Sequence, residues 1–494
     1  MAESRWVLAI DLGTASARAV LFERDGSIAA EAERDLPQHH PQEGWVEYRA
    51  EEIWSVCEDA LLDCLGEIGA LPREIAALGI ACQRETVVLW NRATGRTLGP
   101  APGWQDRRTA PRCAELAGHA GLIEAKTGLP LDPSNPPTKL AWLLDTIEGA
   151  RAAAERGELA CGTIDSFLLW RLTRGRLHAT SPANAARTQL YDIQAQRWDE
   201  ALLALFDIPA SLLPQVMDCD ADFGTTDEAV LGAPVAIRCL IGDQQAAAIG
   251  QACLEPGMLK ATFGSGAFLL LNIGSTLRRS RHHLPTTIAW RLGGKTVYAL
   301  EGAMLNAGTG VQWLMENLRL FDDAEQTAML AATADPARPV YFVPAFNGLG
   351  APYWDAEARG AILGLTRTTG PAELVRAALQ AACYRTRDVL EALAEDGGPM
   401  ASVLRVDGGL AGNDWAMQFL ADILGLPVER PVVTATAALG AAWIAGSSVG
   451  FYPGLDQPAA IWRRDRLFEP RLDAAERDRL YAGWLDAVRR VRSA

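Results

Sequence analysis

Two aspartates in this chain stand beside glycine-rich corners, where a carboxylate and bare backbone can meet a ligand together. Asp11 ends an apolar run and precedes the turn Gly13-Thr14, and Asp243 opens an expected helix. A second small-residue turn, Gly264-Ser265-Gly266, lies between two apolar runs. Such turns point backbone N–H groups at phosphate, and a carboxylate beside a phosphate can hold Mg²⁺ through water. The pattern indicates a phosphate and magnesium site, although an aspartate that caps an ordinary turn would look the same at Asp11.

A cluster of hydrogen-bonding residues follows the apolar run at residues 76–81. Residues 83–85 read Gln-Arg-Glu and place an amide, a cation and an anion at one strand end. Together they can bind several hydroxyl groups of a small polyol. Trp104, in the loop at residues 102–106, can cover the C–H face of such a molecule. A solvated charged turn and a tryptophan that only packs are the alternative interpretations.

Of two further glycine motifs, one is compatible with nucleotide binding and the other indicates only a turn. Asp407-Gly408-Gly409, followed by Asn413, forms a strand, a glycine turn and a helix start. Since glycine has no side chain, such a corner can admit a nucleobase or ribose, and a tight turn is equally compatible with it. Gly293-Gly294-Lys295-Thr296 lacks the earlier glycine of a phosphate-binding loop, because position 289 is alanine. We expect a hairpin turn there.

The glycine turns also indicate internal repetition. Apolar runs flank the turn on both sides at residues 7–22, and again at residues 258–272. Matching strand–turn–strand units predict a chain built as two related halves, which we place at residues 1–252 and 253–494. Strands that alternate with helices along both halves indicate an α/β fold.

The expected elements follow from apolar periodicity and turn residues. Strands are expected at residues 76–81, 87–90, 235–241, 258–263, 268–272, 287–292, 296–300, 340–344 and 404–406. Helices are expected at residues 53–68, 374–393, 414–424, 437–445 and 474–491, and residues 107–206 are expected to be mostly helical, apart from loops at 128–137 and 178–188.

Composition argues against several classes of protein. The formal net charge of −15 disfavours a nucleic-acid partner or an anionic membrane surface, since both attract basic faces. The nine cysteines include no Cys-x-x-Cys pair, and the six histidines have no zinc-binding spacing. The first apolar run is too short for a signal peptide, and the uncharged stretch at residues 431–455 is typical of a buried helix. We therefore expect reduced thiols and a cytoplasmic protein that is not inserted in a membrane.

Taken together, these motifs resemble the FGGY family of carbohydrate kinases over nearly the whole chain. The matching segments are D-L-G-T-x-S-x-R-A-V at residues 11–20, G-W-V-E-Y at 44–48, Q-R-E-T-x-x-x-W at 83–90, W-Q-D-R-R-T at 104–109, G-D-Q-Q-A-A at 242–247, T-F-G-S-G-x-F at 262–268, Y-A-L-E-G at 298–302, P-A-F-x-G-L-G-A-P-Y-W-D at 344–355, A-R-G-A-I-x-G-L-T-R at 358–367 and R-V-D-G-G at 405–409. Within the family, Gly-Asp-Gln-Gln and Gln-Arg-Glu-Thr are similar to the glycerol kinases.

The resemblance implies an actin-like ATPase fold of the ribonuclease H-like type: two related α/β domains, with the active site in the interdomain cleft. The implied reaction is the ATP- and Mg²⁺-dependent phosphorylation of glycerol to sn-glycerol 3-phosphate, by a homodimer or homotetramer. A kinase for a larger polyol or ketose, such as erythritol or xylulose, is the alternative. A non-catalytic actin-like ATP-binding protein is less favoured, because both aspartates and both phosphate turns are intact.

The resemblance also implies a role for each candidate residue. Asp243 becomes the general base, and Asp11 and Asp243 become the magnesium-associated carboxylates. The expected polyol-binding residues are Arg84, Glu85, Trp104, Asp243, Gln244 and Phe268. The expected ATP-binding residues are Thr14, Arg18, Gly264, Ser265, Gly308, Gln312, Gly409 and Asn413.

The chain departs from the family's pattern in two places. Family members that phosphorylate glycerol typically carry a tyrosine after Asp-Pro in the loop before Thr-Lys, whereas this loop reads Asp-Pro-Ser-Asn-Pro-Pro and has Ser134 at that position. Residues 213–243 also contain neither a glycine-rich arginine loop for a sugar bisphosphate nor a histidine for phosphorylation. We expect a polyol pocket that lacks one wall, and no regulation by fructose 1,6-bisphosphate.

Ser134→Tyr should sharpen the preference for glycerol. The tyrosine ring would restore a wall that serine lacks, so KM for glycerol should fall by about 5- to 30-fold, the value of lost contacts worth about 1–2 kcal/mol. The measurement compares kcat/KM for glycerol and erythritol in both forms. An unchanged ratio would show that this loop does not shape the pocket.

Overall fold

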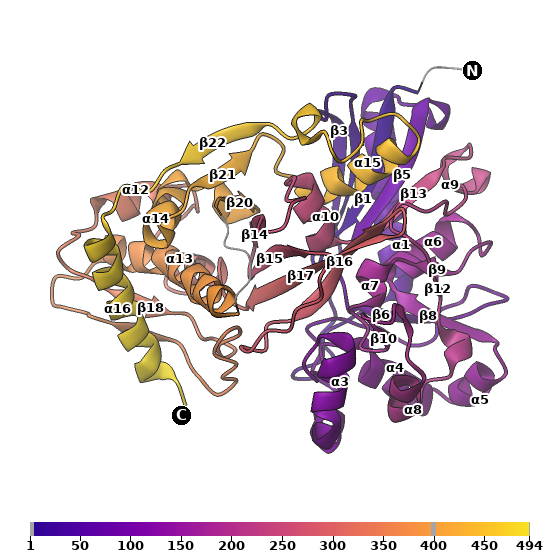
Figure 1. Ribbon diagram of the computed structural model, residues 1–494, viewed down its shortest axis with the longest axis horizontal. Coiled ribbons are helices and arrows are strands. Elements are labelled where there is room, and N and C mark those ends of the chain that lie inside the picture. The colour runs from indigo at the N-terminus through magenta and orange to yellow at the C-terminus, as the bar shows by residue number, and fades with distance from the viewer. Residues whose placement is uncertain (1–3, 397–401, 494) are drawn as a thin grey trace.

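The fold is built on two mixed β-sheets, one in each half of the chain (Figure 1). The computed structural model describes residues 4–396 and 402–493. The first sheet has the strand order β13 (Ile237–Gly242), β5 (Ile75–Cys82), β1 (Trp6–Leu12), β2 (Ser16–Phe22) and β3 (Ile28–Asp35). The second has the order β16 (Thr286–Leu292), β17 (Lys295–Met304), β15 (Ala267–Gly274), β14 (Leu259–Phe263), β20 (Leu404–Asp407), β21 (Val428–Pro431) and β22 (Arg464–Phe468).

Five strands of each sheet follow the same plan, which confirms the predicted repeat. In the first sheet β1 turns back on β2, and β1, β5 and β13 run parallel. In the second sheet β14 turns back on β15, and β14, β20 and β21 run parallel. The two glycine turns therefore occupy equivalent places. The fold class is confirmed as α/β with two related sheets.

Most of the expected elements are present. In the first half, α1 (Ala50–Ile68) packs against β2 and β3 of the sheet. The helices of the second half are α11 (Thr309–Glu316), α12 (Gln326–Thr333), α13 (Pro371–Glu395), α14 (Asp414–Leu424), α15 (Thr436–Ser448) and α16 (Ala474–Val491). Of these helices, α14 and α16 begin where predicted, and α1, α13 and α15 begin one to three residues earlier. The expected hairpin at Gly293 and Gly294 joins β16 to β17, and both glycines have positive φ. The strand expected at 340–344 is β18 (Tyr341–Val343), which pairs with β19 (Ala361–Leu363).

The region at residues 107–206 is less helical than expected. Its helices are α2 (Ala110–Glu115), α3 (Ala120–Thr127), α4 (Pro136–Thr146), α5 (Ala150–Glu155), α6 (Ile164–Leu172), α7 (Pro182–Ala185) and α8 (Glu200–Phe206). The prediction missed β8 (Leu159–Thr163), a strand that pairs with β6 (Val87–Asn91) far away in sequence. The loop expected to run to residue 137 ends at Asn135, because Pro136 and Pro137 form the first turn of α4, where a missing N–H has no cost.

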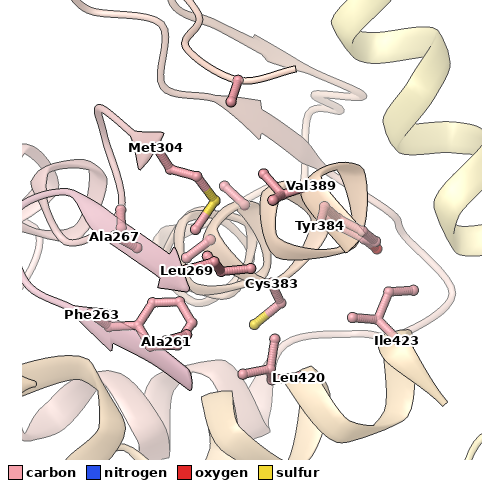
Figure 2. Close-up of a cluster of buried hydrophobic side chains, with 14 of the residues drawn as sticks. Ala261, Phe263, Ala267, Leu269, Met304, Cys383, Tyr384, Val389, Leu420 and Ile423 are labelled. Carbon is pink, nitrogen blue, oxygen red and sulfur yellow. The ribbon is translucent and has the colours of Figure 1, made fainter. Parts of the chain in front are cut away.

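An apolar core lies between the second sheet and its helices. Phe263 and Leu269 of the sheet face Cys383 on α13 and Leu420 on α14 (Figure 2). All four side chains are buried, and each removes its apolar surface from water. This core sets the positions of β14 and β15, whose connecting turn is the second of the two turns predicted to bind phosphate.

Two helices rich in small residues, one from each half, pack with their backbones in close contact and so join the halves. α10 (Asp243–Gly250) follows β13, and α15, the expected buried helix, follows β21. Although α15 comes from the second half, it packs against β1, β5 and β13 of the first sheet (Figure 1). A Cβ on Gly440 would lie 1.9 Å from the carbonyl oxygen of Ala246, and one on Gly250 would lie 2.0 Å from that of Thr436. Only glycine permits this approach at both positions.

Gly440→Ala should destabilise the protein, because the added methyl group would separate α10 from α15. We expect the free energy of unfolding to fall by about 3 kcal/mol, the upper range for overpacking. Gly66→Ala is the matched control: Gly66 lies in α1 and an added Cβ would meet no atom within 4 Å. That variant should gain about 0.5–1 kcal/mol from helix propensity. Urea unfolding of both variants tests this, and equal midpoints would contradict it.

Candidate functional site

The parallel strands of the first sheet end at the same level and bring the predicted site residues together. Leu12 of β1 and Gly242 of β13 both pair with Cys82 of β5. The residues that follow these three ends directly are Gly13, Gln83 and Asp243. Ligands of α/β sheets bind at the carboxyl ends of strands, so this edge is the candidate site.

Asp243 is held in place by three donors. The Nε of Arg84 lies 3.2 Å from its Oδ1, the backbone N of Gln244 donates to Oδ1 at 2.8 Å, and the side-chain amide of Gln244 donates to Oδ2 at 2.9 Å. Burial raises the pKa of Asp243, while the charge of Arg84 and the bonds from Gln244 oppose the rise. A carboxylate with a raised pKa and one fixed orientation is suited to accept a proton.

Asp11 carries a charge that the described protein groups leave poorly compensated. Burial raises its pKa to about 7, and the negative charge of Asp243 adds to the rise, although Arg18 opposes it. A divalent cation beside Asp11 would relieve that repulsion. Among the described residues, no three His, Cys, Asp or Glu side chains are placed to hold a metal ion. One or two carboxylates with phosphate and water are how proteins usually bind Mg²⁺, so Asp11 and Asp243 fit this ion.

A buried network of charges joins the two halves of the chain. Arg84 contacts Glu301 at 2.5 Å, Arg187 contacts Glu301 at 3.3 Å, and Arg187 donates to Glu85 at 2.5 Å. Glu301 lies on β17 of the second sheet, whereas the other three residues belong to the first half. Burial alone would raise the pKa of Glu301, but the charges of Arg187 and Arg84 lower it below its ordinary value. Glu301 is therefore ionised at neutral pH and orients both arginines.

Two of the predicted polyol-binding residues form an aromatic pair that contacts the first glycine turn. The rings of Trp104 and Phe268 meet edge to face, with centroids 6.1 Å apart. The indole N–H of Trp104 donates to Oγ1 of Thr14 at 3.0 Å. The structure thus brings Trp104, Phe268 and the first glycine turn together.

Hydrogen bonds to backbone carbonyl oxygens hold both turns that are predicted to bind phosphate. The side chain of Gln83 donates to the carbonyl oxygen of Gly13 at 2.9 Å. In the second turn, the N–H of Gly308 donates to the carbonyl oxygen of Gly264 at 3.1 Å, and a Cβ on Gly308 would lie 2.7 Å from that oxygen. The N-terminus of α11 therefore approaches the turn closely because residue 308 is glycine.

The predicted nucleotide residues are only partly assembled. Gly408, with positive φ, lies against the backbone of Phe263, so the corner that contains Gly409 adjoins the second phosphate turn. Asn413 caps α14 and donates to Thr327 at 2.9 Å. Arg18 bonds Glu33, and Gln312 bonds Glu316. Within the described part of the chain, no side-chain hydrogen bond joins Arg18 or Gln312 to another predicted site residue.

Sequence reasoning missed four buried charged residues at this site: Arg187, Glu301, Lys139 and Lys260. Lys260 donates to Oε1 of Gln244, and to Oγ1 of Thr262 at 2.9 Å. Burial lowers the pKa of Lys260 to about 8. A signal was present for two of them, because Lys260 and Glu301 interrupt apolar strands, where a charged residue needs a buried partner.

Two family models match this chain. They are the N-terminal domain of the FGGY family of carbohydrate kinases, at residues 6–250, and its C-terminal domain, at residues 259–449. No helix in the described residues is both long and apolar enough to cross a membrane.

The chain is also similar to named relatives over its full length. It is 52% identical to a glycerol kinase of Ectopseudomonas mendocina and 52% identical to glycerol kinase 1 of Pseudomonas aeruginosa, with 99% of each chain covered. Among solved structures, it resembles Plasmodium falciparum glycerol kinase with ADP, with a TM-score of 0.92, 32% identity and 99% and 98% of the two chains covered. Xylulose kinase of Lactobacillus acidophilus shares the fold, with a TM-score of 0.87 at 22% identity and 98% of each chain covered. On these matches, the chain belongs to the FGGY family of carbohydrate kinases.

Proposed function

We propose that this chain transfers the γ-phosphoryl group of ATP to glycerol and forms sn-glycerol 3-phosphate. The observation that carries the proposal is Asp243, which Arg84 and Gln244 hold in one orientation at the strand ends that also bear the first phosphate turn. The two relatives at 52% identity are glycerol kinases, and the match covers 99% of each chain, which supports glycerol as the substrate.

The polyol would lie against Arg84, Glu85, Gln244 and the aromatic pair. Arg84 can donate to one hydroxyl group and Glu85 can accept from another. Trp104 and Phe268 would cover the carbon skeleton and keep water, a competing nucleophile, away from the phosphate. Asp243 would take the proton of the attacking hydroxyl group as the new P–O bond forms and the bond from the γ-phosphorus to the oxygen that leaves with ADP breaks.

The nucleotide would lie on the residues of both turns and of the second sheet. The N–H groups near Thr14, Gly264 and Ser265 would bind phosphate oxygens, with Arg18 as a nearby positive charge. Gly308 and Gln312 on or before α11, and Gly409 and Asn413 at the start of α14, would bind the rest of the nucleotide. Mg²⁺ would neutralise developing phosphate charge, and Asp11 and Asp243 are the residues that would hold it.

A larger polyol is the second candidate substrate. Ser134 is the observation that favours it, because serine leaves space where related kinases place an aromatic ring. Erythritol is the first such compound to test, since it extends glycerol by one carbon.

Three organisational features complete the proposal. We place the domain boundary near residue 252, which agrees with the gap between the two family models at residues 251–258. A homodimer or homotetramer and a cytoplasmic location are proposed from the family resemblance. The net charge of −15 argues against a nucleic-acid partner, because nucleic acid is itself negatively charged.

Asp243→Asn should lower kcat by about a hundredfold or more, since the amide keeps the shape of the side chain but cannot take a proton. KM for glycerol should change much less. The measurement is the steady-state rate of ADP formation with glycerol and Mg²⁺, compared with the unaltered chain. Turnover near that of the unaltered chain would remove Asp243 from the role of base.

Glu301→Gln should weaken glycerol binding. The change leaves two buried guanidinium groups with less compensation, so Arg84 and, through Arg187, Glu85 would shift. We expect KM for glycerol to rise by about tenfold, equivalent to about 1.4 kcal/mol. The stabilising effect of Glu301 should be present above its unfolded pKa and disappear as the pH falls through its lowered folded pKa.

Glu429→Gln is the matched control for that variant. Glu429 is also a buried carboxylate of the second sheet, paired with Arg405 at 3.1 Å. The Glu429→Gln variant should be less stable than the unaltered chain, while its KM for glycerol stays within about twofold of the unaltered value. Equal effects of both changes on glycerol KM would indicate general destabilisation instead of a role for Glu301.

A further inference from the structure

A single buried ammonium group connects three loops of the candidate polyol pocket. Lys139 lies on α4 and is fully buried. Its Nζ donates to the carbonyl oxygens of Glu85 at 3.1 Å, Gly103 at 2.8 Å and Ser134 at 2.6 Å. A lysine with three backbone acceptors and no exposure is costly to keep, because the charge loses its hydration.

Each acceptor belongs to a different segment that carries a pocket residue. Glu85 is itself a candidate polyol ligand, Gly103 directly precedes Trp104, and Ser134 lies where the family resemblance implies a tyrosine. Glu85 lies in the turn between β5 and β6, Gly103 in a separate loop and Ser134 in the loop before α4, and the three loops meet at this one nitrogen atom. The distances between the pocket groups therefore depend on Lys139.

The backbone conformation of Glu85 is an independent reason why its carbonyl group needs the hydrogen bond from Lys139. Its φ is 67°, in the left-handed region that a residue with a side chain adopts at a cost of about 1–2 kcal/mol. Strained residues persist where neighbouring groups hold them. Lys139 binds the carbonyl oxygen of Glu85, and Arg187 binds its carboxylate at 2.5 Å. Main chain and side chain are each held by one cation.

The charge of Lys139 matches its surroundings. An ammonium group has three N–H donors, which equals the number of carbonyl acceptors, whereas a neutral amine has two. Burial lowers the pKa of Lys139 to about 7, and the negative charges of Glu85 and Asp106 oppose this. The ammonium form is the one that satisfies all three carbonyl groups.

We infer that Lys139 is a positioning residue for the polyol, which sets the spacing of Glu85, Trp104 and residue 134 by binding the backbone of all three loops. The inference rests on the proposed function and deepens it. It separates two tasks: Arg187 and Glu301 orient charged side chains, and Lys139 orients the main chain that carries them. In the described part of the chain, the three hydrogen bonds of Lys139 go to loops of the polyol pocket. A phosphate turn is reached indirectly, through the hydrogen bond of Trp104 to Thr14, so the effect of Lys139 should fall chiefly on the polyol.

The test is Lys139→Met, which keeps the length of the side chain and removes its donors. KM for glycerol should rise at least about tenfold, while KM for ATP at saturating glycerol stays within about twofold. A residue with only a structural role would not separate the two constants in this way. Lys126→Met is the matched control, since Lys126 on α3 binds Asp199 away from the pocket, and it should leave both constants unchanged.

A second variant keeps the test possible if Lys139→Met does not fold. Should circular dichroism and thermal melting show that Lys139→Met is unfolded, Lys139→Arg replaces it. Its planar guanidinium keeps the charge but cannot direct three bonds to the same three oxygen atoms. Glycerol KM should then rise by about threefold or more, with ATP KM unchanged.

The outcomes distinguish this inference from the proposed function. If the unaltered chain forms no ADP with glycerol, the proposed function is overturned and this inference falls with it. If the unaltered chain is active and a folded Lys139 variant keeps its glycerol KM within twofold, the inference alone is overturned. A parallel rise in both KM values would overturn it as well, because Lys139 would then act on the whole fold.

Discussion

The close contact between α10 and α15 is the constraint on which the structure depends. The two helices follow equivalent strands of the two sheets, and glycine at positions 250 and 440 lets their backbones touch. α10 begins at Asp243, so the packing that joins the halves also sets the position of the proposed base. The neighbouring apolar cluster contains residues of both halves, which makes this junction part of the core. Catalytic geometry and domain attachment therefore share one interface.

The site is then assembled from charges that neither half could bury alone. Arg84, Glu85 and Arg187 come from the first half, and Glu301 comes from the second. Removing an ion from water costs several kcal/mol in a protein interior, and partners at hydrogen-bonding distance offset that cost. Each of these side chains has such a partner. The exception is Asp11, whose pKa is raised to about 7 first by burial and then by the charge of Asp243, a repulsion that a bound Mg²⁺ would relieve. The residues proposed to bind the polyol are thus joined by more contacts than those proposed to bind the nucleotide.

Particular residues show how far sequence reasoning reached. Asp11 and Asp243 were found because each stands beside a glycine corner, and the repeat was found because both glycine turns lie between apolar runs. The apolar pattern also located the long helices α13 and α16, since local periodicity decides such elements. By contrast, β8 was missed because it is stabilised by pairing with β6, and the sequence between them does not signal that contact. Arg187 and Lys139 were missed for a related reason: nothing in their local sequence shows that they are buried.

Residue type, spacing and order were enough to predict the α/β class, the internal repeat, the family and the chemical groups at the site. Which of these groups meet depends on how the chain folds. The contact of Trp104 with Phe268, the bridge of Glu301 between two arginines, and the three bonds of Lys139 all join residues that are distant in the chain. Such contacts are properties of packed elements, since burial and strand register bring together side chains whose own sequence contexts are independent.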